Sequence, residues 1–449
     1  MKLIPMLALA AALCSTTVSM SAQADSADDA LMRAIHAGDT AKVTQALKQG
    51  AKLNKPRADG SLPLAWAVET QNPALVALLL TKGAKADLGD AQPQSFSPLV
   101  VACQRGDPAI VAALLDSGAD VKRTTSTGIS PLALCAGNSS VAMVKRLLEL
   151  GAPVDAADDS GQTPLMWAAA KGQLASLQLL LNQGAEINRT TAKGFTPLFF
   201  ALTSKTPDTA LALLEAGANA DYVAPDGTTL VQMAIYQQQF VVAEQLVQRG
   251  VDFNAIDRNG NQLLHAAVRH RQLPLVNALL AKGANPNALT GTSAVVWRYE
   301  VNFTSRPYVT YPQTPLLLAA ELGDTAIMRA LVAAGADVNF RAQDGTSLVL
   351  AAVRSNASAL SLALSLAPDV KATNKRGETA LHLLLGYSFY MPMTVEQISA
   401  MLLVLAQKGA PIDLADSSGK TPLAIAQLED FRAKPEFATA FQLSPQVKL

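Results

Sequence analysis

A sequence period of about 33 residues is the feature that most constrains how this chain can fold. A Leu-Leu-x-x-Gly-Ala segment, or a close variant of it, recurs so that successive glycines lie one such period apart at Gly118, Gly151, Gly184, Gly217, Gly250 and Gly283. A fixed period of this length indicates a stack of similar units, each of which buries its apolar side chains against the units before and after it. This period overrides the roughly three separate domains that chain length alone would suggest.

A second landmark follows the same period. A Thr or Ser followed by Pro and Leu begins at Ser97, Ser130, Thr163, Thr196, Thr314 and Thr421. Thr and Ser cap helix starts, and Pro suits the first helical position, where its missing N–H is not needed. The repeat glycine then suits the residue just after a second helix. Each unit is therefore predicted to hold two helices.

These motifs resemble the ankyrin repeat family, whose unit is a β-turn followed by two helices. The resemblance covers about residues 28–443 and points to an exported bacterial ankyrin-repeat protein. It implies a mainly α solenoid of about 11–12 helix-turn-helix/β-hairpin units with an inserted β-hairpin arm. We expect a single array over 25–449, with an N-cap at 25–59, repeats at 60–418 and a C-cap at 419–449 in which a helix runs from Pro435 to Leu443.

The first 24 residues have the pattern of an export signal. Lys2 is followed by the apolar run Leu3–Leu13, and small residues precede a cleavage site after Ala24, so the mature chain is predicted to begin at Asp25. The apolar run is too short to span a bilayer, and Leu13 before Cys14 is too bulky for a lipoprotein signal. No later membrane span is predicted. We expect the periplasm as the location, with full secretion as the second choice.

Cys103 and Cys135 remain after removal of the signal. Two cysteines can pair in an oxidising compartment. The repeat places them on neighbouring inner helices, which typically pack about 8–10 Å apart, whereas a disulfide needs Cα atoms within about 7 Å. The favoured interpretation is therefore two small buried residues, with a disulfide as the alternative.

Catalytic chemistry has little support in the sequence. Lys+Arg and Asp+Glu number 36 each, which excludes a nucleic-acid binder that relies on bulk positive charge. His265 and His382 follow the motif Leu, where a histidine is expected to hydrogen-bond within the turns. The sequence lacks the common motifs for metal binding, nucleophilic catalysis and phosphate binding. We assign no catalytic residue, metal site or cofactor and predict that the protein is not an enzyme.

Binding residues can be projected from the period, because ankyrin stacks usually hold a partner protein in a groove lined by turns and inner helices. The positions on the turn side are Phe96, Ile129 and Phe195. Those on the helix side are His36, Glu69, Gln104, Arg105, Lys171, Tyr236, Arg269, His270, Glu321 and Arg354. The alternative is that each apolar residue packs on its neighbouring hairpin. Trp66, Trp167 and Phe200 are expected in the core.

Two steps between repeat endings are longer than the period. The first inserts a segment near 290–312 in which Trp297 and Tyr299 alternate with polar residues, as in a half-buried strand. A turn at Thr304–Pro307 and a second strand with Tyr308 complete a predicted β-hairpin arm. Because aromatic residues dominate interface hot spots, the arm is a candidate binding element. The alternative is an arm folded back over its own repeats.

The second long step adds a segment near 386–393 that includes Tyr387. Thr394 and Gln397 then form a capping-box pattern that predicts the next helix start. Both insertions lie in the C-terminal half, where we expect specificity for a partner.

The function predicted is a periplasmic protein–protein interaction module or scaffold that binds a partner protein in its concave groove without catalysis. One alternative is a small-ligand or glycan-binding protein, or an enzyme, that uses the aromatic insertion. Another is a secreted protein that binds a host protein or a toxin.

Overall fold

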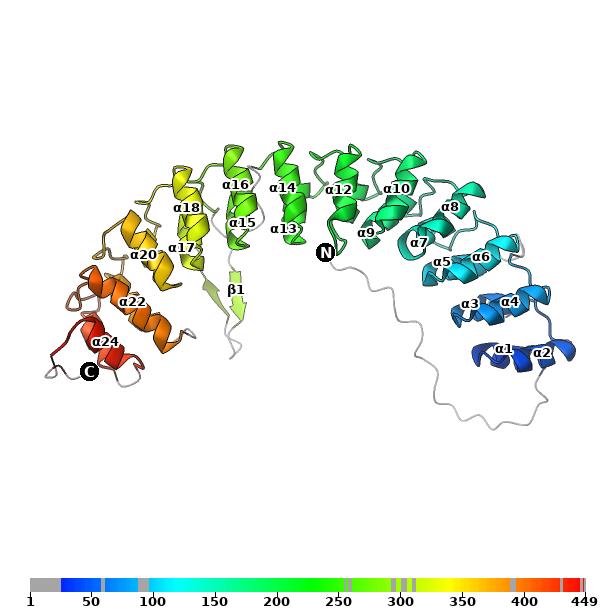
Figure 1. Ribbon diagram of the computed structural model, residues 1–449, viewed down its shortest axis with the longest axis horizontal. Helices are drawn as coiled ribbons and strands as arrows, with labels where there is room; N and C mark the ends of the chain where they lie inside the picture. The colour runs from blue at the N-terminus through cyan, green and yellow to red at the C-terminus, as the bar shows by residue number, and fades with distance from the viewer. Residues whose placement is uncertain are drawn as a thin grey trace. The chain divides into compact units, whose positions relative to one another are not determined.

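The computed structural model describes residues 26–57, 61–87, 97–253, 256, 261–291, 296–299, 305–308, 312–387, 393–428, 431–444 and 447. The chain divides into two compact units, Met1–Asp159 and Ser160–Leu449. Figure 1 shows that each unit is built from pairs of antiparallel helices that follow one another along the chain. The predicted signal segment 1–24 lies outside the described residues.

The first unit contains four helix pairs. Their bounds are α1 Ala27–His36, α2 Thr40–Lys48, α3 Pro63–Glu69, α4 Pro73–Thr81, α5 Pro98–Arg105, α6 Pro108–Asp116, α7 Pro131–Asn138 and α8 Val141–Glu149.

The second unit continues the same pattern. Its first helices are α9 Pro164–Lys171, α10 Leu174–Asn182, α11 Pro197–Ala201, α12 Asp208–Glu215, α13 Leu230–Tyr236, α14 Phe240–Gln248, α15 Leu263–Arg269 and α16 Leu273–Ala281. Two strands follow, β1 Val296–Tyr299 and β2 Ser305–Tyr308. The remaining helices are α17 Pro315–Leu322, α18 Thr325–Ala333, α19 Leu348–Ala352, α20 Ala357–Leu366, α21 Ala380–Tyr387, α22 Val395–Gln407, α23 Pro422–Ala426 and α24 Lys434–Ala440.

The helices form two layers within each unit. Inner helices contact the inner helices of neighbouring repeats, as α3 contacts α5 and α15 contacts α17, while outer helices such as α14 and α16 contact one another. The inner helices bury the motif Leu and the alanines that follow it, which lets them approach closely. The structure therefore confirms a mainly helical repeat solenoid.

Four of the six Thr/Ser-Pro motifs begin an inner helix with the predicted capping bond, at Ser130, Thr163, Thr314 and Thr421. Thr163 and Thr314 accept hydrogen bonds from backbone amides three residues later, with Pro at the first helical position. The prediction is wrong at Ser97 and Thr196, whose buried hydroxyl oxygens make no capping bond and have no hydrogen-bond partner within the described residues. The following Pro still fixes the backbone for a helix start at these two sites.

The turn between inner and outer helices requires a positive φ. Gly106, Gly172 and Gly323 provide it, but Gln71, Gln238 and Arg271 occupy the equivalent turns with φ values of 53°, 57° and 56°. A left-handed conformation is costly for residues with a Cβ, so three repeats carry local backbone strain.

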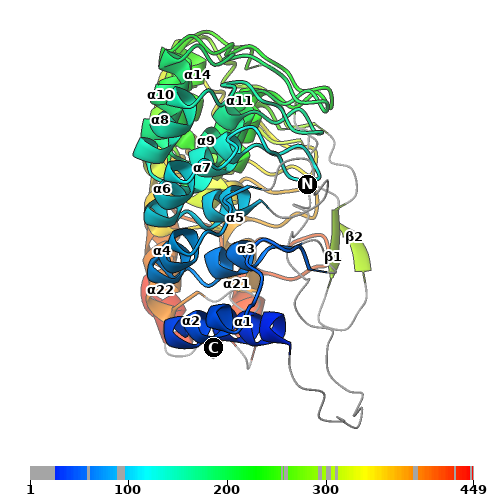
Figure 2. The ribbon, with the colours of Figure 1, turned by 90° about the vertical axis from the view of Figure 1, so that its right-hand side faces the viewer.

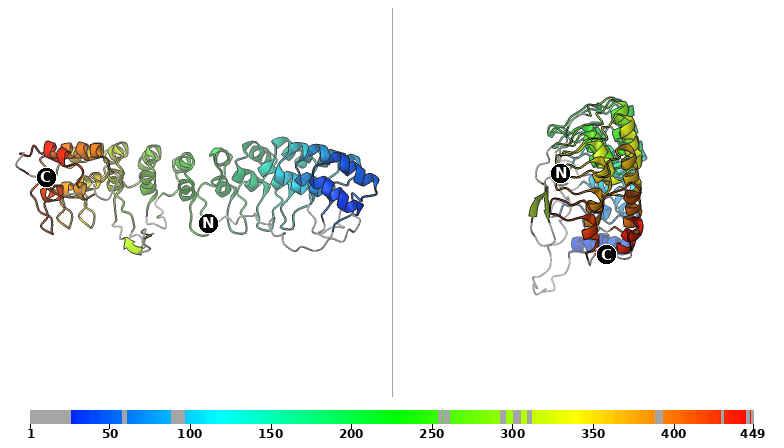
Figure 3. Two further views of the ribbon diagram at one scale, coloured as in Figure 1. Left: turned by 90° about the horizontal axis from the view of Figure 1, so that it is seen from below. Right: turned by 90° about the vertical axis from the view of Figure 1, so that its left-hand side faces the viewer.

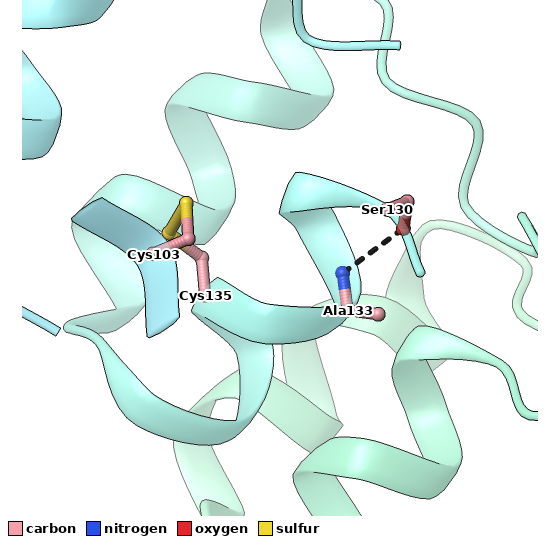
Figure 4. The surroundings of a disulfide bond; sticks show 4 residues. All are labelled: Cys103, Ser130, Ala133 and Cys135. Carbon is pink, nitrogen blue, oxygen red and sulfur yellow. Dashed lines mark hydrogen bonds between the residues drawn. A yellow bond between two sulfur atoms is a disulfide. The ribbon is translucent and has the colours of Figure 1, made fainter. Parts of the chain in front are cut away.

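A disulfide joins the inner helices α5 and α7 in the first unit. Cys103 and Cys135 have Cα atoms 4.5 Å apart, and both side chains are fully buried (Figure 4). The favoured interpretation of two unpaired cysteines is therefore wrong. The two helices lie closer together than the typical spacing. Gly106, just after α5, has no Cβ, and a Cβ there would overlap the backbone oxygen of Asn138 in α7. The absence of that Cβ lets the two helices approach closely.

The two strands pair antiparallel, with Val296 opposite Tyr308 and Tyr299 opposite Ser305. Figures 2 and 3 show the pair on the side toward which the loops between repeats project. The predicted turn at 304–307 is wrong for Ser305 to Pro307, which lie in β2. In a two-stranded sheet both strands are edges, where Pro is tolerated. The rest of the arm lies outside the described residues, so the extended arm stays a prediction.

The C-terminal part differs from the prediction in two places. Gly386 and Tyr387 belong to α21 rather than to the inserted segment, because the helix runs on to Tyr387. The final helix α24 ends at Ala440, short of Leu443. The capping box of Thr394 and Gln397 at the start of α22 is confirmed. Among the described residues, no helix has the length and apolarity needed to cross a membrane.

Candidate partner-binding face

The candidate site is the exposed side of the inner helices, here called the inner-helix face. It is formed by the residues two, five and six positions after the motif Leu. Residues three and four apart on a helix share one side, so these three positions form one stripe on each inner helix. Stacking the repeats places the stripes next to one another.

In the first unit, the polar residues of this face are engaged with their neighbours. The Nε of Arg105 donates to Glu69 Oε2 of the preceding repeat at 2.9 Å. The ring of His36 packs edge-on against Trp66 with centroids 4.9 Å apart. The indole Nε1 of Trp66 donates to Ser61 Oγ at 2.8 Å. Gln104 is exposed. Several predicted groove residues therefore bind each other across repeats.

The same arrangement recurs further along the second unit. Arg354 in the turn after α19 binds Glu321 of α17 with a nitrogen–oxygen distance of 3.1 Å. Both side chains are largely buried. This predicted pair of groove residues also serves to link neighbouring repeats.

The inner helices α9, α11, α13 and α15 of the second unit present a different surface. Trp167, Phe200 and Met233, each two positions after the motif residue, are half-buried. The prediction that Trp66, Trp167 and Phe200 lie in the core is wrong in this respect, since all three are only half-buried. Tyr236, at the end of α13, is 51% exposed. A row of partly exposed apolar side chains therefore runs along the inner-helix face.

Cations lie at the ends of the same helices. Lys171 and Arg269 are exposed, and neither makes an ion pair within the described part of the chain. His270 is half-buried, with its ring 5.3 Å from that of Phe240. The apolar row is thus bordered by positive charge.

The turn-side candidates are packed to different degrees. Phe195 lies edge-on to buried Phe199, with centroids 5.6 Å apart, and Phe199 in turn contacts Tyr222 at 6.0 Å. The hydroxyl of Tyr222 donates to the backbone oxygen of Gly194 at 2.7 Å. Phe195 therefore packs on Phe199 of its own repeat, and Tyr222 of the next hairpin packs on Phe199. Ile129 is half-buried, and Phe96 lies outside the described residues.

The arm candidates are placed only by their backbones. Trp297 and Tyr299 lie in β1, Tyr308 lies in β2, and Tyr387 is the last residue of α21. The structure does not bring Tyr387 into the strand pair, which lies before α17 in the chain.

Hydrogen bonds close the base of the arm. The amide of Thr290 donates to the oxygen of Gln313 at 3.0 Å. His265 Nε2 lies 3.1 Å from the oxygen of Ala288 and 3.2 Å from that of Gln313, so this nitrogen is the donor. His265 therefore hydrogen-bonds within the turns, as expected. Its two acceptors, Ala288 and Gln313, lie on either side of the inserted segment in the sequence. His382 acts similarly, with Nε2 3.0 Å from the oxygen of Lys420.

Sequence reasoning missed an exposed aliphatic row on the turn side of the second unit. Val223, Ile256 and Leu289 are exposed by 49%, 60% and 46%, and they lie one period apart at equivalent positions. A comparison of this one position between successive repeats of the sequence would have revealed them.

Among the described residues, no set of three or more His, Cys, Asp or Glu side chains is arranged to hold a metal ion. A hollow of about 400 Å³ between α1 and α2 is lined by alanines, glutamines, Arg33 and Lys42. Hydrogen bonds lower the pKa values of the Asp39, Glu396 and Asp416 carboxyls. For Asp39, the largest contribution comes from the hydrogen bond donated by the backbone amide of Lys42. These carboxylates lie at helix starts and in a turn.

Comparison with known families agrees with this architecture. A family model described as three copies of ankyrin repeats matches residues 99–191, 132–226 and 198–290, and a single ankyrin repeat matches 313–343. Repeats of this kind indicate a protein–protein interaction module, and proteins built from them are generally non-catalytic scaffolds that bind protein partners. The chain is an ankyrin-repeat protein.

Proposed function

We propose that this protein is a non-catalytic interaction module of the periplasm that holds a partner protein against its inner-helix face. The observation that carries the proposal is the row of partly exposed Trp167, Phe200, Met233 and Tyr236. Aromatic residues are enriched in interface hot spots, and a contiguous apolar row on a surface marks a contact site.

The periplasmic location is supported by two features. The first 24 residues have the charge, apolar run and small residues of an export signal. The buried disulfide between Cys103 and Cys135 suits an oxidising compartment, because thiols in the cytosol are kept reduced. Fractionation of the producing cell checks this part, and recovery of the uncut chain in the cytosol would contradict it.

A pull-down with the full mature chain from a periplasmic extract tests the binding part. One protein captured in stoichiometric amount is expected. The Trp297→Ala plus Tyr299→Ala variant tests whether the arm contributes, and Tyr236→Ala tests the inner-helix face. Retention of the partner by both variants would contradict binding through these residues.

A further inference from the structure

We infer that the inner-helix face between α9 and α15 recognises an acidic amphipathic segment, in which carboxylates lie beside apolar side chains. This inference rests on the proposed function and names the chemistry of the partner. The two halves of the argument are the charge at the rim of the face and the apolar row along it.

The charge on this part of the face is one-sided. The exposed cations Lys171 and Arg269 are the last residues of α9 and α15, and exposed Lys205 lies beside the face, four residues after the end of α11; none of the three makes an ion pair within the described residues. On the inner-helix face of the first unit Arg105 is paired with Glu69, and in later repeats of the second unit Arg354 is paired with Glu321. The fold therefore neutralises its cations in other repeats and leaves those of the central repeats available to a partner.

The apolar row forms the second half of the argument. Trp167, Phe200 and Met233 are half-buried and Tyr236 is 51% exposed, so each offers part of its apolar side chain to a partner. The apolar side chains of an amphipathic segment can pack against this row.

Other occupants fit less well. A second copy of the chain would bring like charges together, since an isologous contact opposes the same cations. Nucleic acid matches the cations, but its phosphates have no use for the half-buried Phe200 and Met233 between them. An acidic amphipathic polypeptide matches both the charge and the apolar row.

Binding of synthetic peptides to the full mature chain tests the inference. The first peptide alternates glutamate with leucine and phenylalanine, and the second replaces each glutamate with lysine. Fluorescence anisotropy is expected to show binding of the acidic peptide alone, weakening as salt screens the charges. Equal binding of both peptides, no binding of the acidic one, or equal competition by single-stranded DNA would overturn the inference.

Charge reversal locates the site. Lys171→Glu plus Arg269→Glu is expected to weaken binding of the acidic peptide about tenfold or more, through lost attraction and new repulsion. Arg249→Glu plus Lys282→Glu is the matched control, because it makes the same charge change at exposed ends of outer helices. Equal affinities of the two variants would overturn the site. Circular dichroism and the melting temperature check that both variants fold.

The outcome also separates this inference from the proposed function. If the Lys171→Glu plus Arg269→Glu variant still captures its periplasmic partner with unchanged affinity, the interaction module stands and the acidic recognition fails. If the wild-type chain captures no partner but binds the acidic peptide at this face, the recognition chemistry stands and the proposed periplasmic role fails.

Discussion

Single residues carry local strain in this protein where neighbouring repeats avoid it. Gln71, Gln238 and Arg271 adopt positive φ at turns where other repeats use glycine. In the case of Arg271 the side chain makes a compensating contact, since its guanidinium donates to the oxygen of Leu322 in the next repeat at 2.7 Å. Gln238 is exposed, and its backbone amide donates to the backbone oxygen of Ile235 within its own repeat at 3.0 Å.

Replacement of Gln238 by glycine is therefore expected to stabilise the protein. Removing the Cβ relieves a left-handed conformation, which is worth about 1 kcal/mol in the free energy of unfolding. Urea unfolding of the variant measures it. Gln237→Gly is the matched control. Gln237 has a φ of −86°, so glycine relieves no strain there and lowers the stability of the protein by giving the unfolded chain more conformational freedom. An unchanged or lower stability of Gln238→Gly would refute the strain.

Asp39 makes the start of α2 sensitive to pH. Its carboxylate accepts from the amide of Lys42 at 3.0 Å and lies 3.1 Å from the Lys42 ammonium, and these contacts lower its pKa. A carboxyl whose pKa is lower in the folded state stabilises that state above its unfolded pKa, and the effect is lost as pH falls through the folded pKa.

The stability difference between wild type and Asp39→Ala is thus expected to be largest at neutral pH and to shrink in acid. Thermal unfolding of both proteins across this pH range measures it. A difference that stays constant, or that grows on acidification, would show that the carboxylate charge does not contribute.

At the scale of elements, the link between α5 and α7 distinguishes one pair of repeats. Cys103 and Cys135 are 32 residues apart in sequence, so their disulfide closes a long loop in the unfolded chain. A cross-link of this length restricts the unfolded ensemble and is worth about 4 kcal/mol.

Reduction of the unfolded chain, followed by refolding, is expected to lower the stability of the first unit by that amount. Urea unfolding with and without reductant measures it, and the Cys103→Ala plus Cys135→Ala variant should not respond to reductant. Equal stabilities of oxidised and reduced wild type would contradict a stabilising disulfide.

Elements also show what a repeat pattern can and cannot predict. Helix starts at Thr163 and Thr314 follow from local capping chemistry, so the sequence predicts them. The disulfide depends on how closely two particular helices approach, which Gly106 permits and an average spacing hides. In the same way, the exposed side of Trp167 and the pairing of Glu321 with Arg354 depend on neighbours in adjacent repeats. The period locates such residues but not their contacts.

At the scale of the whole molecule, partly exposed side chains of the inner helices follow one another from repeat to repeat among the described residues of the second unit. Each repeat buries its apolar stripe against the next, so binding of a partner requires no rearrangement of the core. In the second unit, Glu321 and Arg354 pair on this face and join neighbouring repeats, whereas the side chains of Trp167, Tyr236 and Arg269 reach the surface. The candidate site is therefore the inner-helix face from α9 to α15, where the described cations Lys171 and Arg269 form no ion pairs between repeats.

Amide hydrogen exchange on the chain with and without its captured partner tests this account most directly. The account predicts slower exchange in the partner complex for the C-terminal ends and following turns of α9, α11, α13 and α15, with no change in the outer helices α10, α12, α14 and α16. Protection confined to those outer helices, or no protection in α9 to α15, would contradict it.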